Sequence, residues 1–216
     1  MKIEITSCLA VSEGKEIELV IETSEVYKMN TYRYTVPREA YARLGEPMGE
    51  ISRETMKDLR YEEEKYRATK KALDILAFGR NSSKTLARKL RHRNFTPEIC
   101  DEVAELMKEK GYIREDEDVI LDAEACIEKC WGMRRTLMYL HDKGYNNETL
   151  ASARAFLSEV DYVELCAELI RKQYGKLPKD DAGRQKIFSA LLRFGYSTTE
   201  IRKAALLVDR YDPTEN

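Results

Sequence analysis

The 216-residue sequence is poor in the residues that break helices and in histidine. It contains 10 glycines, 5 prolines and 2 histidines, whereas 35% of its residues are charged and 43% are hydrophobic. Its apolar runs are too short to span a bilayer, and we expect no signal peptide at Met1-Lys2-Ile3-Glu4. This composition is typical of a largely helical protein, which we expect in the cytoplasm and without a membrane partner.

The sequence also lacks the common catalytic motifs. It has no G-x-S-x-G, no glycine-rich phosphate loop and no H-E-x-x-H. The run Asp116-Glu117-Asp118 has no second acidic cluster or histidine to complete a metal site. We interpret it as the first turn of a helix, where the macrodipole favours acids. We therefore predict that the protein is not an enzyme and uses no cofactor.

Five cysteines are scattered along the chain without a C-x-x-C pair: Cys8, Cys100, Cys126, Cys130 and Cys166. Cys126 and Cys130 are four residues apart and would share a helix face, where a metal site is one alternative. With so few histidines, reduced thiols in an apolar stripe explain the pattern better. We predict no metal.

A unit of about fifty residues recurs three times. Each copy has a leucine, three intervening residues, an Asn or Gly, and then an aromatic residue. The aromatic residues are Phe95, Tyr145 and Tyr196, so the spacings are 145 − 95 = 50 and 196 − 145 = 51 residues. A fixed period of this length indicates supersecondary units that stack on their neighbours. The predicted structural anchors are Leu90, Phe95, Leu140, Gly144, Tyr145, Leu191, Gly195 and Tyr196.

We interpret each anchor as the end of one helix and the start of the next. The leucine lies in the last turn of an amphipathic helix, and Asn94, Gly144 or Gly195 takes the left-handed position after it. The aromatic side chain then packs back beneath the turn. Thr96-Pro97 indicates an N-cap followed by proline at the first helical position. Ser197 with Glu200 fits a capping box.

The first 51 residues differ from the rest because apolar residues occur there at strand spacing. We predict three antiparallel strands ended by Pro37, a turn at Ser12-Glu13-Gly14-Lys15, and a short helix from Arg38 to Leu44. A long helix should run from about Ser52 to Phe78. The predicted strands are Lys2–Thr6, Glu16–Ile21 and Thr31–Val36.

The predicted fold is mainly α, with three tandem three-helix, helix-turn-helix-like repeats in a curved array after the small β-sheet. The predicted divisions are 1–51 for the β-rich extension, 52–114 for the long helix and repeat 1, 115–160 for repeat 2, and 161–216 for repeat 3 and a frayed tail. The predicted repeat helices are 67–78, 83–93, 97–110, 117–130, 133–143, 147–157, 162–174, 183–194 and 198–209.

Basic residues cluster locally although the net charge is −2. A helical step of 100° places Lys84, Arg88 and Arg91 together, away from the apolar face. Arg134 and Arg135 occupy the positions of Lys84 and Thr85 in the second repeat, and Lys186 matches Arg135 in the third. An ordinary solvated face and a discontinuous cationic strip, suited to an acidic protein groove or to phosphates, both explain the pattern. The candidate partner-binding residues are Lys84, Arg88, Arg91, Arg134, Arg135 and Lys186.

Three motifs in order resemble those of the RecX family, the regulatory proteins of the bacterial recombinase RecA. The first is Ala72-Leu73-x-x-Leu76-x-x-x-Arg80-x-Ser82-Ser83-x-x-Leu86-x-x-Lys89-Leu90, which continues into Gly111-Tyr112-Ile113-x-x-Asp116-Glu117-Asp118. The second is Gly132-x-x-Arg135-x-x-x-x-Leu140-x-x-Lys143-Gly144, and the third is Lys186-x-x-x-x-Leu191-x-x-x-Gly195-Tyr196-Ser197. Asn94 departs from the glycine that is usual in the family.

The resemblance implies a non-enzymatic modulator, most often an inhibitor, that lodges in the groove of the RecA–DNA filament. It would alter ATP hydrolysis, strand exchange and filament persistence, in DNA repair, recombination and the SOS response. We expect a monomer whose partner is the RecA filament on DNA, with at most weak direct contact to DNA. The alternative is a helix-turn-helix-type nucleic-acid-binding protein that acts directly on DNA. The negative net charge and the broken cationic strip count against it.

Overall fold

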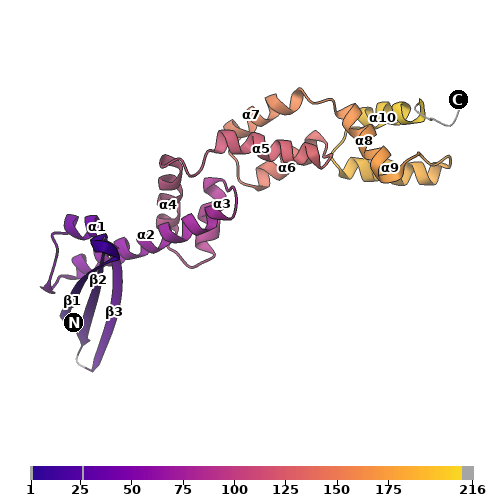
Figure 1. Ribbon diagram of the computed structural model, residues 1–216. Coiled ribbons are helices and arrows are strands. Elements are labelled where there is room, and N and C mark those ends of the chain that lie inside the picture. Colours follow the sequence, from indigo (N-terminus) through magenta and orange to yellow (C-terminus); the bar gives the residue numbers. More distant parts are fainter. Residues whose placement is uncertain (1, 26, 211–216) are drawn as a thin grey trace. The chain divides into compact units, whose positions relative to one another are not determined.

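The computed structural model describes residues 2–25 and 27–210 and divides the chain into two compact units. Unit 1 contains the residues up to Gly79 together with Leu86–Lys110, and unit 2 contains Arg80–Thr85 and the residues from Gly111 onward. The described residues form ten α-helices and one four-stranded antiparallel sheet, so the fold is mainly α as predicted (Figure 1). The frayed tail predicted after Asp209 falls mostly on 211–216, outside the described residues.

The N-terminal sheet has the strand order β3-β2-β1-β4, so the prediction of three strands was wrong. β4 pairs with β1. It has only two residues, so it is too short to leave a periodic pattern in the sequence. The predicted turn is present as a 3₁₀ turn, η1, over Ser12–Gly14. The strands are β1 Lys2–Val11, β2 Glu16–Glu25, β3 Lys28–Pro37 and β4 Gly49–Glu50.

One face of the sheet is covered by the long helix α2 (Arg53–Ala77), after the short helix α1 (Arg38–Arg43). Ser52 begins α2 as its N-cap, because its side chain accepts from the Thr55 amide. Leu59 of α2 is fully buried among apolar residues of the strands and α1. The buried residues of this shared core are Ile3, Ile5, Ile17, Leu19, Ile21, Tyr34, Val36, Tyr41 and Leu59.

The remaining helices begin and end within two residues of their predicted bounds. They are α3 Ser83–Arg91, α4 Pro97–Glu109, α5 Glu115–Glu128, α6 Met133–Asp142, α7 Asn147–Ser158, α8 Tyr162–Tyr174, α9 Asp181–Arg193 and α10 Thr198–Arg210.

The caps of two helices test the sequence interpretation closely. Ser197 and Glu200 form the predicted capping box at α10, with the Glu200 amide 3.2 Å from Ser197 Oγ and the Ser197 amide 2.6 Å from Glu200 Oε2. Thr96 lies at the N-cap position of α4, but its side chain does not cap the helix. Its amide and Oγ1 donate instead to Glu64 of α2, which a local pattern could not reveal.

The three repeat anchors have the backbone that their residue types predict. The φ angles are 62° at Asn94, 89° at Gly144 and 97° at Gly195, all left-handed. The anchor leucines and aromatic residues are buried: Leu90, Phe95, Leu140, Tyr145, Leu191 and Tyr196.

In unit 2, the turn after α6 packs against the start of α3. The Lys143 carbonyl accepts from Ser82 Oγ at 2.6 Å and from Thr85 Oγ1 at 2.5 Å. A Cβ at Gly144 would lie 2.8 Å from Ser82 Oγ and 3.2 Å from Lys84 Cβ. Glycine is therefore required both by the left-handed backbone and by the neighbouring repeat.

The turn after α9 packs against the start of α6 in the equivalent way. The Gly132 amide donates to the Phe194 carbonyl at 2.8 Å. A Cβ at Gly195 would lie 2.5 Å from the Arg135 amide nitrogen, and one at Gly132 would lie 2.4 Å from the Gly195 carbonyl carbon. Because backbone meets backbone here, neither glycine can gain a side chain without moving a helix.

The start of α9 contacts the loop that precedes it. In the two earlier repeats, the start of the corresponding helix, α3 or α6, contacts the glycine turn of the next repeat. Gly183 lies 183 − 132 = 51 residues after Gly132, and a Cβ there would lie 2.7 Å from Pro178 Cβ. The Pro178 carbonyl accepts from Arg184 Nε at 2.8 Å. This loop thus packs against the first turn of α9.

Three glycine variants should separate backbone strain from steric clash. Gly175 has a φ of 67° and open space around it, so Gly175→Ala should cost about 1 kcal/mol of unfolding free energy from strain alone. Gly132→Ala adds a clash without strain and should cost about 2 kcal/mol. Gly195→Ala adds both and should cost about 3 kcal/mol. Chemical denaturation of the three variants measures the order, and equal losses would contradict the packing of the turns.

Within unit 2, a buried carboxylate links the turn after α6 to the segment before α3. Asp122 of α5 is 4% exposed, and its Oδ2 accepts from Lys143 Nζ and from the Tyr145 hydroxyl, each at 2.6 Å. Arg80 Nη2 lies 3.4 Å from its Oδ1. Burial and the hydrogen bond to Asp122 raise the pKa of Tyr145, so the phenol stays protonated and donates.

Asp122→Asn should destabilise unit 2 because the amide removes the charge that Lys143 and Arg80 share. We expect a loss of about 1–3 kcal/mol in unfolding free energy, since both cations still reach solvent in part. Asp118→Asn is the matched control, because Asp118 lies 4.0 Å from Arg80 Nε. A loss at Asp118 as large as that at Asp122 would show that the buried contacts are not what matters.

Candidate partner-binding surface

The four predicted cations outside α6 have different local surroundings. Lys84 is in the first turn of α3, where its Cβ lies beside the Gly144 turn. Arg91 is bound to Asp101 of α4, so its charge is partly neutralised. Arg88 on α3 and Lys186 on α9 are exposed. The local contacts of these four cations differ, and the single strip suggested by their sequence spacing stays a prediction.

Arg134 and Arg135 lie together at the start of α6. Arg134 Nη2 donates to the Leu192 carbonyl at 3.0 Å. The Arg135 guanidinium lies 4.0 Å from the centroid of the Trp131 ring and 5.1 Å from that of Phe194. Both arginines are thus held in place by neighbouring groups, with their charge retained at the surface.

Two shallow hollows flank the exposed side of α6. One has a volume of about 390 Å³ and the other about 420 Å³. Met138 borders both and is 61% exposed. We call this region the α6 surface, defined by Trp131, Arg134, Arg135, Leu137, Met138, Tyr139, His141, Asp142, Asn147, Leu150, Arg154, Arg193 and Gly195.

The α6 surface is strongly cationic. Four arginines border it, Arg134, Arg135, Arg154 and Arg193, against the single carboxylate of Asp142. Within the described part of the chain, Arg154 and Arg193 form no ion pair. An exposed methionine surrounded by arginines and aromatic rings has the composition that is enriched at protein interfaces.

Sequence reasoning found Arg134 and Arg135 but missed Met138, Arg154 and Arg193. Met138 follows Arg134 by four residues, so the helical step could have placed both on one face. Arg154 belongs to α7 and Arg193 to the end of α9. No spacing rule connects these two with α6, because packing between helices brings them there.

No group of three or more His, Cys, Asp and Glu side chains is placed to hold a metal ion among the residues described. Cys100, Cys126, Cys130 and Cys166 are buried, whereas Cys8 is exposed. Over the described ranges, every helix is too short or too polar to cross a membrane.

Curated relatives share sequence with 62–67% of this chain. No family model matches the chain. Regulatory protein RecX of Xanthomonas campestris pv. campestris (strain B100) is 29% identical over 138 residues, which cover 62% of this chain and 83% of that protein. Regulatory protein RecX of Stenotrophomonas maltophilia (strain R551-3) is 29% identical over 150 residues, covering 67% of this chain and 86% of the relative.

Two solved structures share the fold. A crystal structure of regulatory protein RecX has a TM-score of 0.68 at 14% identity, covering 93% of this chain and 97% of the other. The crystal structure of RecX from Lactobacillus salivarius has a TM-score of 0.56 at 18% identity, covering 68% and 97%. The relatives, the fold and the three ordered repeat motifs agree, and together they support assignment of the chain to the RecX family of regulatory proteins.

Proposed function

We propose that this protein regulates the RecA recombinase by binding the RecA–DNA filament through the α6 surface. The cationic surface around Met138 is the observation that carries the proposal. Family membership supplies the partner. Lodged in the filament groove, the protein would lower ATP hydrolysis, limit strand exchange and shorten filament persistence, and so act in DNA repair and recombination.

The α6 surface suits a partner that offers carboxylates around a small apolar pocket. Met138 supplies a flexible apolar side chain that adapts to irregular pockets. The planar guanidinium groups of Arg154 and Arg193 can each bind a carboxylate through two parallel hydrogen bonds. Arg135 is already ordered by Trp131, so binding costs it little conformational freedom.

Several repeats in one chain would allow the protein to regulate its partner by binding alone, without catalysing a reaction. We propose that residues 52–114, 115–160 and 161–216 are the three repeats, with the long helix in the first, and that 1–51 is an N-terminal β-rich extension. Contacts from several repeats of one chain strengthen one another through effective concentration. A ligand changes an equilibrium only by its differential affinity, so preference for the assembled filament over free subunits would suffice for regulation.

Substitutions on the α6 surface should weaken binding to the filament without unfolding the protein. Met138→Ala should raise the dissociation constant about tenfold, and Arg154→Glu with Arg193→Glu should raise it further. Lys203→Glu on α10 is the matched control, because Lys203 is exposed and outside the α6 surface. Fluorescence anisotropy on RecA-coated DNA measures binding, and circular dichroism checks the fold. Unchanged affinity in both the Met138→Ala variant and the Arg154→Glu/Arg193→Glu double variant would remove the α6 surface from the interface.

Naked DNA should bind far more weakly than RecA-coated DNA. The net charge of −2 gives no bulk attraction to phosphates, and the four arginines of the α6 surface would neutralise only a few of them. Binding to the filament should weaken as salt rises, because exposed charges are screened over about 8 Å at physiological ionic strength. Equal affinity for naked and coated DNA would favour the helix-turn-helix-type alternative.

A further inference from the structure

The strand β3 forms a long open edge of the N-terminal sheet. β3 pairs with β2 through all ten residues, from Glu16 opposite Pro37 to Glu25 opposite Lys28. In the order β3-β2-β1-β4 no strand of the described chain lies on its other side. An open edge presents unpaired amides and carbonyls to any extended chain that approaches.

The register shows which residues face that open edge. The Arg38 amide donates to the Lys15 carbonyl at 2.9 Å, directly after Pro37, which has no amide hydrogen. Residues of an antiparallel pair alternate between bonding the partner strand and facing away from it. Even-numbered residues of β3 therefore bond β2, and the odd-numbered Met29, Thr31 and Arg33 present their backbone to the open edge.

This edge lacks most features that prevent strand pairing. The β2–β3 register has no bulge, whereas the β1–β2 register shifts between Ile5 and Ser7. The other edge of the sheet, β4, has two residues, while β3 has ten. β3 also exposes apolar side chains, with Met29 69% and Tyr32 39% exposed. Such a strand has the length and the side chains to dock a partner strand.

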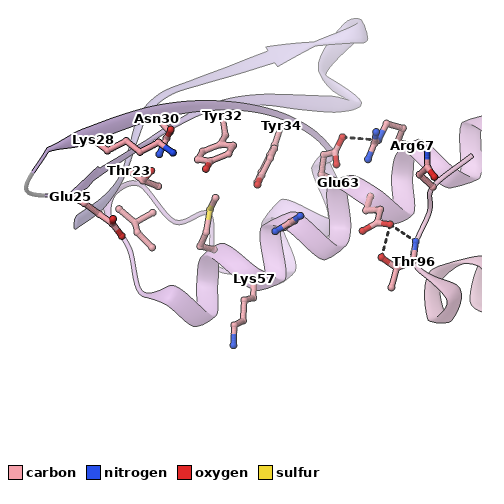
Figure 2. A pocket seen from close by; sticks show the side chains of 15 residues that line it. Thr23, Glu25, Lys28, Asn30, Tyr32, Tyr34, Lys57, Glu63, Arg67 and Thr96 are labelled. Atoms are coloured by element: carbon pink, nitrogen blue, oxygen red, sulfur yellow. Dashed lines mark hydrogen bonds and ion pairs between the residues drawn. The ribbon is translucent and has the colours of Figure 1, made fainter. Parts of the chain in front are cut away.

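A cleft of about 800 Å³ lies between β3 and α2. Its lining includes Lys28, Asn30, Tyr32 and Tyr34, the even-numbered residues of β3. Figure 2 shows Tyr32 and Tyr34 directed from the strand toward α2. Since side chains of a strand alternate between its two faces, every second side chain of an added strand would enter this cleft.

The lining of the cleft has one more cation than carboxylates. The cations are Lys28, Lys57, Arg60 and Arg67, and the carboxylates are Glu25, Glu63 and Glu64. Glu63 is paired with Arg67, and Glu64 accepts from Thr96, so these two carboxylates are already engaged (Figure 2). Lys28 and Arg60 also line the cleft and have no ion-pair partner among the residues described. β3 itself carries no acidic residue. The cleft therefore complements carboxylates.

We propose that β3 and this cleft bind an extended acidic segment of a partner protein by strand addition. The segment would pair its backbone with Met29, Thr31, Arg33 and Thr35. Its acidic side chains, at every second position, would enter the cleft toward Arg60 and Lys28, and its apolar side chains would lie beside Met29. This site is independent of the α6 surface.

A proline on the open edge tests the strand pairing. The probe is a fluorescein-labelled octapeptide of alternating Glu and Val, titrated against the full chain. Thr31→Pro removes an outward amide but no bond to β2, so the sheet should persist while the dissociation constant rises about tenfold. Thr31→Val keeps the amide and should bind as the parent protein does. No binding at millimolar peptide, or equal binding by Thr31→Pro, would overturn the proposal.

Amide hydrogen exchange gives a readout specific to strand addition. Bound peptide should slow exchange at Met29, Thr31, Arg33 and Thr35, with little change at Tyr32, which already bonds β2. Protection elsewhere without protection at these odd-numbered residues would contradict the proposed pairing.

Charge variants test the chemistry of the occupant. Arg60→Glu should weaken binding of the Glu-Val peptide, whereas Arg53→Glu, on α2 outside the cleft, should not. An alternating Lys-Val peptide should bind poorly, and equal binding would overturn the proposal.

Tighter binding of oligo(dT) than of the Glu-Val peptide would assign the cleft to single-stranded nucleic acid instead. Loss of a concentration-dependent dimer in Thr31→Pro, without peptide binding, would assign the edge to a second copy of this chain.

Discussion

The organisation of unit 2 depends on the close packing of a glycine turn against the start of a helix in the preceding repeat. At Gly195 and Gly132 the two backbones meet with no space for a Cβ, and the Gly132 amide is bonded to the Phe194 carbonyl. This contact fixes the position of α9 relative to α6. Because Arg193 ends α9 and Arg134 lies in the first turn of α6, the same contact brings both arginines to the α6 surface.

The start of α9 in the third repeat is packed differently from the starts of α3 and α6 in the first two repeats. At the start of α9, Gly183 and Arg184 contact the loop at Pro178. In the two earlier repeats, the corresponding helix start contacts the glycine turn of the next repeat. Terminal units of repeat arrays need a covered face, since an open stacking face would bind further copies. Asn94 stands where the later repeats have glycine, and its side chain is exposed. The tight packing that demands glycine at 144 and 195 thus does not extend to the first turn.

Local signals made most of the fold predictable from sequence. Helix ends were placed well because Gly144, Gly195 and the Ser197 cap act within a few residues of the chain. The strand β4 and the bond from Thr96 to Glu64 depend on residues distant in sequence, so periodicity could not indicate them. The candidate surface was predictable only in part for the same reason. Arg134 and Arg135 share a helix, whereas Arg154 and Arg193 reach it through packing.

Regulation of RecA by direct binding to its filament is the central claim, and a titration of this protein into a DNA-stimulated RecA ATPase reaction tests it most directly. If the protein binds the filament, ATP hydrolysis should fall with added protein and level off well below one copy per RecA subunit, because several repeats act on neighbouring subunits. Hydrolysis that stays constant while the protein saturates RecA-coated DNA would contradict regulation of the ATPase. Inhibition that requires enough protein to cover the DNA itself would instead show competition for DNA.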